Sequence, residues 1–300
     1  MRRSCLGILV LIILLSSCTG SGGSHTMFSP FFTGKWTATI VSPTQGQLAN
    51  LDMNLAQTGD AISSDSLNTI DNLDCDGNIS THMDSTTGTV TGNQFNLVFS
   101  VNGESISLTG TIVAGGKSVS GNFTSGGGPC LNGEGGTFTA AFIPPVTGMY
   151  TGTLNSVSNV VSNATAMLSE DANFNVSASV VVTNNTCFSS LATVAPDFGM
   201  SIGDSTIFDV TDGTNEIDFI GRILQVDSSL SGIAGFWEVT GTCPTDGNFQ
   251  LTFGTGGAMR APDASGASTT ASTAESTSES KISPLMVERL KALLAARREK

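Results

Sequence analysis

The sequence has little charge and few of the side chains on which catalytic sites depend. Charged residues make up 12% of its 300 residues, and it contains two histidines and two tryptophans. Histidine is the most common general base in enzymes. His25 and His82 accompany no recognisable nucleophile motif, and no phosphate-binding loop or zinc-protease motif is present. We therefore expect a non-enzymatic protein with no catalytic residue, no bound metal and no cofactor.

Basic residues are nearly missing from the centre of the chain. Between Gly34 and Phe253 there are three, Lys35, Lys117 and Arg222, against twenty acidic residues, a formal charge of −17. Such a surface repels phosphate backbones, so a nucleic-acid partner is excluded. The last twenty residues reverse the sign, with six basic residues against two acidic ones. This asymmetry indicates a separate role for the C-terminal segment.

Strong helix formers are also scarce, whereas Gly, Ser, Thr and Asn are abundant, and this composition favours β structure with many turns. From Gly34 to Phe142, apolar residues alternate with polar ones as they do in half-buried strands. Roughly eight strands fit this stretch. The same alternation recurs in the second half of the chain. In both halves it places aromatic residues on inward faces: Phe95, Phe99, Phe123, Phe138, Phe174, Phe219 and Phe249.

The first eighteen residues have the pattern of an export signal. Arg2 and Arg3 precede an apolar run over residues 6–15, which is too short for a membrane span of about 20 residues. The segment Leu-Ser-Ser-Cys at residues 15–18 resembles the lipobox of bacterial lipoproteins. The resemblance implies that residues 1–17 are a signal peptide, and that Cys18 carries a diacylglyceryl thioether and an N-acyl chain such as palmitate. Because two acyl chains already hold a protein stably, three would anchor it permanently.

Residues 18–33 are rich in Gly, Ser and Thr and are predicted to be a lipidated tether. Thr19 stands where many inner-membrane lipoproteins of Gram-negative bacteria have an aspartate. The lipoprotein resemblance therefore implies a cell-envelope protein, and it favours the outer membrane.

Four cysteines remain once Cys5 has left with the signal peptide and the lipobox cysteine is modified. Exported proteins form disulfides, and four cysteines allow three pairings. Cys75 and Cys130 are 55 residues apart, and Cys187 and Cys243 are 56 apart. These nearly equal intervals favour one bridge within each half of the chain. No pair has the short spacing of a structural zinc site.

The second half of the chain repeats the first. The opening sequence GKWT at residues 34–37 has its counterpart in GMYT at residues 148–151, and residues 130–142 resemble residues 243–253. Pro144 and Pro145 separate the halves, since neither can donate to a β ladder. The two predicted domains are residues 34–143 and 146–254.

Antiparallel strands joined by tight turns either close into an up-and-down barrel or stack as a sandwich. The segment Gly34-Lys35-Trp36 resembles the first-strand motif of calycins, the superfamily of lipocalins and avidins. The resemblance implies an eight-stranded barrel with the tryptophan at one end. We therefore expect an all-β protein with two tandem antiparallel up-and-down, calycin-like barrels.

The C-terminal region has a different composition. Residues 255–281 lack periodicity and are predicted to be a disordered linker. Residues 282–300 are predicted to form a short amphipathic basic helix, because Ser283 and Pro284 suit its start. Since a lone helix of this length is marginal in water, it should dock on another surface. Its apolar stripe consists of Met286, Leu290, Leu293 and Leu294.

Two acidic groups could carry chemistry. Asp71, Asp74 and Asp76 surround Cys75 in a pattern loosely similar to a calcium loop, but the required glutamate at the twelfth position is missing. In the second half, paired carboxylates could serve a glycosidase. Acidic side chains at strand ends also keep a barrel soluble, and we interpret both groups as solvated surface. The second group comprises Asp204, Asp209, Asp212, Glu216 and Asp218.

The expected function is that of a membrane-anchored envelope lipoprotein whose barrels have a structural role or bind a small apolar ligand. An eight-stranded barrel either fills with side chains or holds one small ligand. The alternative is a surface or assembly module. In that alternative the acidic barrels and the basic C-terminal helix contact an envelope protein, peptidoglycan or anionic lipid.

Overall fold

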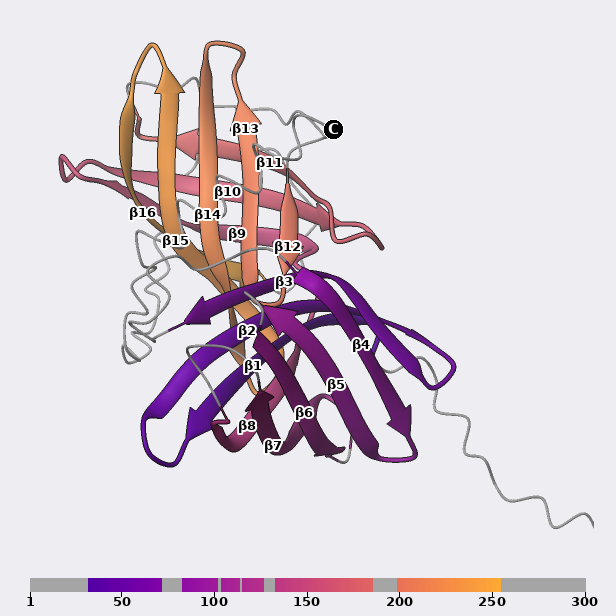
Figure 1. The fold of residues 1–300 in the computed structure, drawn as a ribbon. Helices are drawn as coiled ribbons and strands as arrows, with labels where there is room; N and C mark the ends of the chain where they lie inside the picture. The colour runs from indigo at the N-terminus through magenta and orange to yellow at the C-terminus, as the bar shows by residue number, and fades with distance from the viewer. Residues whose placement is uncertain are drawn as a thin grey trace, which may run out of the picture.

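The computed structural model describes residues 32–71, 83–101, 104–113, 115–126, 133–185 and 199–254. In this part of the chain all regular secondary structure is β, and it forms two eight-stranded antiparallel sheets, one from each half (Figure 1). Among these residues no helix has the length and apolarity needed to cross a membrane. The predicted signal peptide, Cys18, the linker 255–281 and the helix 282–300 lie outside the described residues.

The first sheet is a closed up-and-down barrel, here called barrel 1. Each strand pairs with the next, and β8 returns to pair with β1 from Lys35–Ile143 to Val41–Thr137. The β3–β4 ladder is short, with three residue pairs beginning at Ala61–Thr89. The strands are β1 (Gly34–Ser42), β2 (Gly46–Thr58), β3 (Ala61–Asp71), β4 (Met83–Thr91), β5 (Gln94–Val101), β6 (Glu104–Ile112), β7 (Ser118–Gly126) and β8 (Gly135–Ile143).

The second sheet, here called sheet 2, follows the same meander from β9 (Gly148–Ser156) onward. Its order is β11-β10-β9-β16-β15-β14-β13-β12, so every strand has the neighbour of its counterpart in barrel 1 except at the β11–β12 seam. The other strands are β10 (Val161–Glu170), β11 (Val176–Thr183), β12 (Met200–Ile202), β13 (Ser205–Thr211), β14 (Asn215–Val226), β15 (Ser229–Gly241) and β16 (Thr245–Gly254).

The all-β prediction is confirmed, whereas a closed second barrel is not. Within the described residues, the ends of sheet 2 meet through one bridge, between Asn175 and Met200. Two hydrogen bonds flank it: the Val176 N–H donates to the Gly199 carbonyl (2.9 Å), and the Ser201 N–H donates to the Phe174 carbonyl (3.0 Å). Because β12 is only three residues long, it cannot carry the ladder that closure would need.

The two halves repeat each other in side-chain detail. Trp36 Nε1 donates to the backbone carbonyl of Phe32 (3.2 Å), and the Tyr150 hydroxyl donates to the carbonyl four residues before it, that of Val146 (2.8 Å). Gly34 and Gly148 precede these rings with φ of 139° and 148°. A Cβ at either glycine would clash with a phenylalanine ring of the last strand, Phe142 or Phe253. Tyr150 therefore takes the structural place of Trp36.

Side chains fill the inside of both sheets. In barrel 1, Phe95, Phe99, Phe123 and Phe138 are buried as predicted, and the Phe32 ring stacks at 5.0 Å on both Trp36 and Phe95. In sheet 2, the buried ring of Phe219 stacks on Phe208 at 4.9 Å and meets Phe249 edge-on at 5.3 Å.

The prediction that Phe174 lines an inward face was wrong. Phe174 lies in the turn before β11 with a φ of 62°, and its N–H donates to the Asp171 carbonyl. The Asp171 carboxylate accepts the N–H groups of Asn173 (2.8 Å) and Asn175 (2.9 Å). These local hydrogen bonds stabilise a turn, so the strand starts two residues later than the alternation predicts.

Candidate functional site

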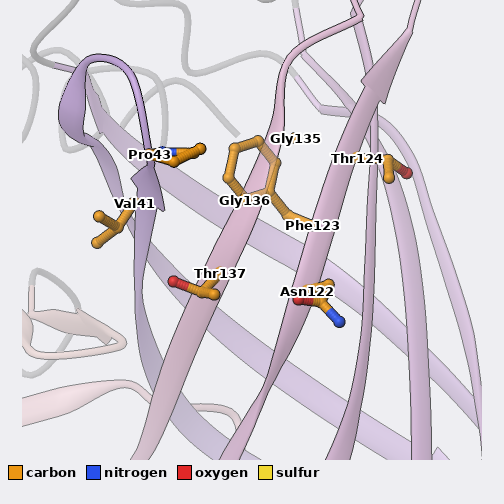
Figure 2. A pocket seen from close by; sticks show the side chains of 8 residues that line it. All are labelled: Val41, Pro43, Asn122, Phe123, Thr124, Gly135, Gly136 and Thr137. Atoms are coloured by element: carbon orange, nitrogen blue, oxygen red, sulfur yellow. The ribbon is translucent and has the colours of Figure 1, made fainter.

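A hollow of about 410 Å³ opens on barrel 1 where the end of β1 lies beside β7 and β8 (Figure 2). Val41, Pro43 and the Phe123 ring line it, and no charged side chain does. Gly136 is required here, because a Cβ would lie 2.2 Å from the Val41 carbonyl oxygen and 2.8 Å from the Phe123 ring. The hollow offers a small apolar surface and no reactive group.

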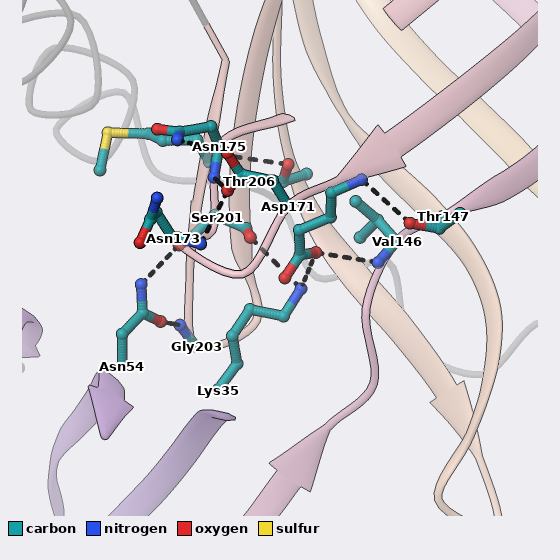
Figure 3. A network of polar contacts seen from close by, with 12 residues as sticks. Lys35, Asn54, Val146, Thr147, Asp171, Asn173, Asn175, Ser201, Gly203 and Thr206 are labelled. Atoms are coloured by element: carbon teal, nitrogen blue, oxygen red, sulfur yellow. Dashed lines mark hydrogen bonds and ion pairs between the residues drawn. The ribbon is translucent and has the colours of Figure 1, made fainter. Parts of the chain in front are cut away.

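The most polar buried place in the described chain is the contact between barrel 1 and sheet 2. Lys35 of β1 reaches across it, and its Nζ donates to Glu170 at the end of β10 (2.5 Å) and to the Ser201 hydroxyl of β12 (3.3 Å) (Figure 3). The side chains of Lys35 and Glu170 are 1% and 3% exposed. The same Glu170 oxygen accepts the Val146 N–H (2.9 Å), so the ion pair also fixes the segment between the sheets.

A second set of contacts joins β2 to the tight turn between β12 and β13. Asn54 donates to the Ser201 carbonyl (2.8 Å) and accepts the Gly203 N–H (3.2 Å). Asp52 accepts the Ser205 hydroxyl (2.6 Å). Gly203 has a φ of 54°, and a Cβ there would lie 2.6 Å from the Asp52 Cβ. The turn therefore approaches barrel 1 as closely as only glycine permits.

Strand register explains why these side chains gather. Trp36 points into barrel 1, so its neighbours Lys35 and Thr37 point outward. Lys35 pairs with Asn54 and Thr37 with Asp52, which places all four on one outer face of β1 and β2. That face is the one that sheet 2 covers.

Burial shifts the pKa values of the ionisable groups at this contact. Burial lowers the pKa of Lys35, an effect that the Glu170 carboxylate opposes. Burial also raises the pKa of Asp52 to about 8, and the nearby Asp204 carboxylate acts in the same direction while Arg222 opposes it. Asp52 therefore keeps its proton at neutral pH. Arg222 donates to the Asp204 carboxylate through Nε (3.0 Å) and Nη2, so these two groups are paired with an opposite charge.

A row of carboxylates crosses the outer face of sheet 2. The register pairs Asp209 with Asp218, Asp218 with Glu238, and Glu238 with Asp246, over β13 to β16. The side-chain oxygens of Asp209, Glu216 and Asp218 all lie within 4.8 Å of one another, so these three could share a cation. We call Asp209, Asp218, Glu238 and Asp246 the carboxylate row.

The structure divides the acidic residues that the sequence singled out. Asp209, Glu216 and Asp218 come together, whereas Asp204 belongs to the contact with barrel 1, where its N–H donates to the Asp52 carboxyl group (3.4 Å). Asp212 accepts the N–H groups of Thr214 and Asn215 in the β13–β14 turn, and these hydrogen bonds lower its pKa. Its role is to hold that turn.

Several predicted positions lie outside the described residues: Asp74, Asp76, Cys75, Cys130, Cys187, His25 and His82. Asp71 is the last residue of β3.

Sequence reasoning missed Asp52 and Asn54, because their alternation with Leu51, Met53 and Leu55 predicted a solvent-facing side. Lys35 carried a usable signal. A lysine among only three basic residues in a domain region with twenty acidic ones is a candidate for a specific ion pair.

Comparison with known proteins adds little. No protein-family model matches the chain, and no curated protein matches its sequence. The chain is similar to a crystal structure from Nitrosomonas europaea described as a candidate AttH protein. The match has 12% identity and a TM-score of 0.22, and it covers 73% of this chain and 91% of that chain. At this TM-score the similarity has no bearing on function.

Proposed function

We propose that the protein is a lipid-anchored, non-enzymatic component of the cell envelope in which the two β domains act as one rigid structural unit. The observation that carries the proposal is the buried polar contact between them. Lys35, Asp52 and Asn54 are each at most 3% exposed, and each forms a hydrogen bond with a polar group of sheet 2. Buried polar networks of this kind fix one geometry, because every group must keep its partner. Interiors filled with aromatic side chains favour the structural role.

The anchor is tested by changing Cys18 to Ser, with Cys5→Ser as the matched control. We expect wild type and Cys5→Ser to partition into the detergent phase of Triton X-114 and to yield a triacylated N-terminal cysteine by mass spectrometry. Cys18→Ser should stay in the aqueous phase. Partition that is the same for all three proteins would contradict the anchor. Density-gradient separation of the membranes then tests the outer-membrane location.

The disulfide pairings Cys75–Cys130 and Cys187–Cys243 are part of this proposal. Successive connections in an up-and-down meander alternate between its two ends. The strand ends flanking Cys75, in the β3–β4 connection, therefore lie at the same end of barrel 1 as those flanking Cys130, in the β7–β8 connection. Cys187 and Cys243 lie in the corresponding connections of the second half, β11–β12 and β15–β16. This topology makes each within-half pair compatible with the fold.

A small apolar ligand is a second candidate role, which the hollow beside Phe123 favours by its volume and lining. Native mass spectrometry of protein purified gently from its host should then show an excess mass that disappears on denaturation. Thr137→Trp would fill the hollow and abolish that mass, while Thr139→Trp, exposed two residues further along β8, would leave it unchanged. A ligand-free mass for the wild type would contradict this role.

The other alternative is an interaction module, in which acidic surfaces and the basic C-terminal segment contact an envelope protein, peptidoglycan or anionic lipid. The carboxylate row favours it. A pull-down from envelope extract in which deletion of residues 283–300 removes the bound partner would support this role, and an unchanged set of partners would contradict it.

A further inference from the structure

The carboxylate row needs positive charge close to it. Side chains at directly paired strand positions lie about 4.5–5.5 Å apart, so like charges there destabilise the sheet. The row places four acidic residues in such positions on consecutive strands, and Glu216 lies beside two of them. All four members of the row are buried or half-buried, so bulk water screens them incompletely.

The described part of the chain has no basic residue left to supply this charge. Lys35 is paired with Glu170, and Arg222 is paired with Asp204. Lys117 is exposed on the turn between β6 and β7 of barrel 1. Half of the twelve basic residues of the chain, in contrast, lie in residues 281–300.

The surface next to the carboxylate row is covered although it faces outward. Ile207 and Ile220 form the neighbouring outward pair of β13 and β14, outside the core of sheet 2, and both are 0% exposed. The outward pair Asn96 and Thr109 on β5 and β6, the counterpart strands of barrel 1, is exposed. Another segment of the protein therefore lies against Ile207 and Ile220.

We infer that residues 281–300 are this segment and that they dock on the outer face of β13 to β16. The apolar stripe of the predicted helix covers Ile207 and Ile220, and its basic side chains lie over the carboxylate row. Among the other segments outside the described residues, 19–31, 72–82, 127–132 and 186–198 carry no Lys or Arg, so charge favours the C-terminal one.

The tether is long enough for this docking. A flexible chain as long as the 26 residues between Gly254 and Lys281 would have a root-mean-square span of roughly 28 Å. β13 lies three strand spacings from β16, which is about 14 Å. The docking depends on neither the lipid anchor nor a partner, so it can be tested apart from the proposed function.

Trypsin digestion of the full chain, with Cys18→Ser to keep it in solution, tests the inference. Trypsin can cut the segment at Arg289, Lys291, Arg297 and Arg298. Docking should slow these cuts about tenfold or more relative to the free peptide of residues 281–300, because cleavage tracks the undocked population. Cleavage at the rate of the free peptide would overturn the inference.

Paired variants identify the docking face. Asp218→Asn/Glu238→Gln should abolish the protection, while Asp60→Asn/Asp227→Asn, which removes two exposed charges elsewhere, should retain it. Protection that survives Asp218→Asn/Glu238→Gln would overturn the inference, as would protection that arises only with vesicles containing phosphatidylglycerol.

A binding measurement keeps the test valid if the variant unfolds. The peptide 281–300, labelled with a fluorophore, should bind a chain that ends at residue 280. Raising the salt from 50 mM to 500 mM should weaken this binding at least tenfold. The same peptide should not bind the untruncated chain, whose docking face is occupied. Equal binding to both chains, or binding to neither, would overturn the inference.

Discussion

Replacing Lys35 by Met tests whether barrel 1 and sheet 2 are stabilised as a unit. Lys35 and Glu170 are almost fully buried, and the substitution would leave the Glu170 carboxylate hydrogen-bonded to the Val146 N–H but without its counter-ion. Breaking a buried ion pair from one side typically costs about 3–5 kcal/mol, because the remaining charge stays buried without its counter-ion. We expect Lys35→Met to lower the free energy of unfolding by about this amount.

The two tryptophans make the assay specific for each domain. Trp36 lies in barrel 1 and Trp237 in sheet 2, both buried, so Trp237→Phe and Trp36→Phe give proteins with one reporter each. In urea, Lys35→Met should shift the fluorescence midpoints of both reporters, although the substitution lies in barrel 1. Adding Glu170→Gln removes the stranded charge and keeps an acceptor for Val146, so we expect it to recover at least about 2 kcal/mol.

Lys117→Met is the matched control. Lys117 is exposed and also belongs to barrel 1, so its replacement should change stability by no more than about 0.5 kcal/mol. A Trp237 midpoint that is unaffected by Lys35→Met would refute the reasoning, because sheet 2 would then be stable without its contact to barrel 1. A loss as small as that of Lys117→Met would refute the burial of the ion pair.

Three further predictions follow from the same contact and from the cysteine spacing. Burial raises the folded-state pKa of Asp52 to about 8, above the ordinary aspartate value of 3.8. Its stabilising contribution is therefore complete below about pH 4 and is lost as the pH rises through 8. Thermal melts between pH 4 and 9 should show that Asp52→Asn, which cannot ionise, loses less stability over this range than the wild type; parallel curves would contradict the shift. Gly203→Ala should lower stability by at least about 2 kcal/mol in urea titrations because its Cβ would strike Asp52, whereas Gly213→Ala, with a φ of 86° and open space around it, should lose only about 1 kcal/mol from backbone strain; equal losses would contradict the tight contact. Non-reducing peptide mapping should find only the two within-half pairs, Cys75–Cys130 and Cys187–Cys243. A pair between halves would contradict the tandem arrangement.

The repeated pattern made the strands predictable from the sequence. Alternation placed Phe95, Phe99, Phe123 and Phe138 inside barrel 1, and the match between GKWT and GMYT placed Tyr150 where Trp36 stands. Phe174 was misplaced because a strand period says nothing about the side-chain hydrogen bonds of Asp171, which turn the chain there.

The contact between the sheets could not be predicted from alternation. Alternation distinguishes inward from outward positions within one sheet, and it placed Asp52 and Asn54 correctly on an outward face. It cannot show that an outward face is covered by a second domain more than a hundred residues away in the chain. The carboxylate row was likewise hidden, because its four members become neighbours only through the register of four strands.

The contact also has a consequence for symmetry. Barrel 1 contributes β1 and β2, whereas the second repeat contributes Glu170 at the end of β10 together with β12 and β13, the counterparts of β4 and β5. Such an interface is heterologous, because the two domains contribute different faces. Each domain then has one face left over, and further domains of the same kind could bind there and extend into a filament. The corresponding face of the second repeat carries different residues. By strand register, Lys35, Asp52 and Asn54 are replaced there by Met149, Thr165 and Met167. The second repeat therefore cannot offer these polar contacts to another domain of the same kind.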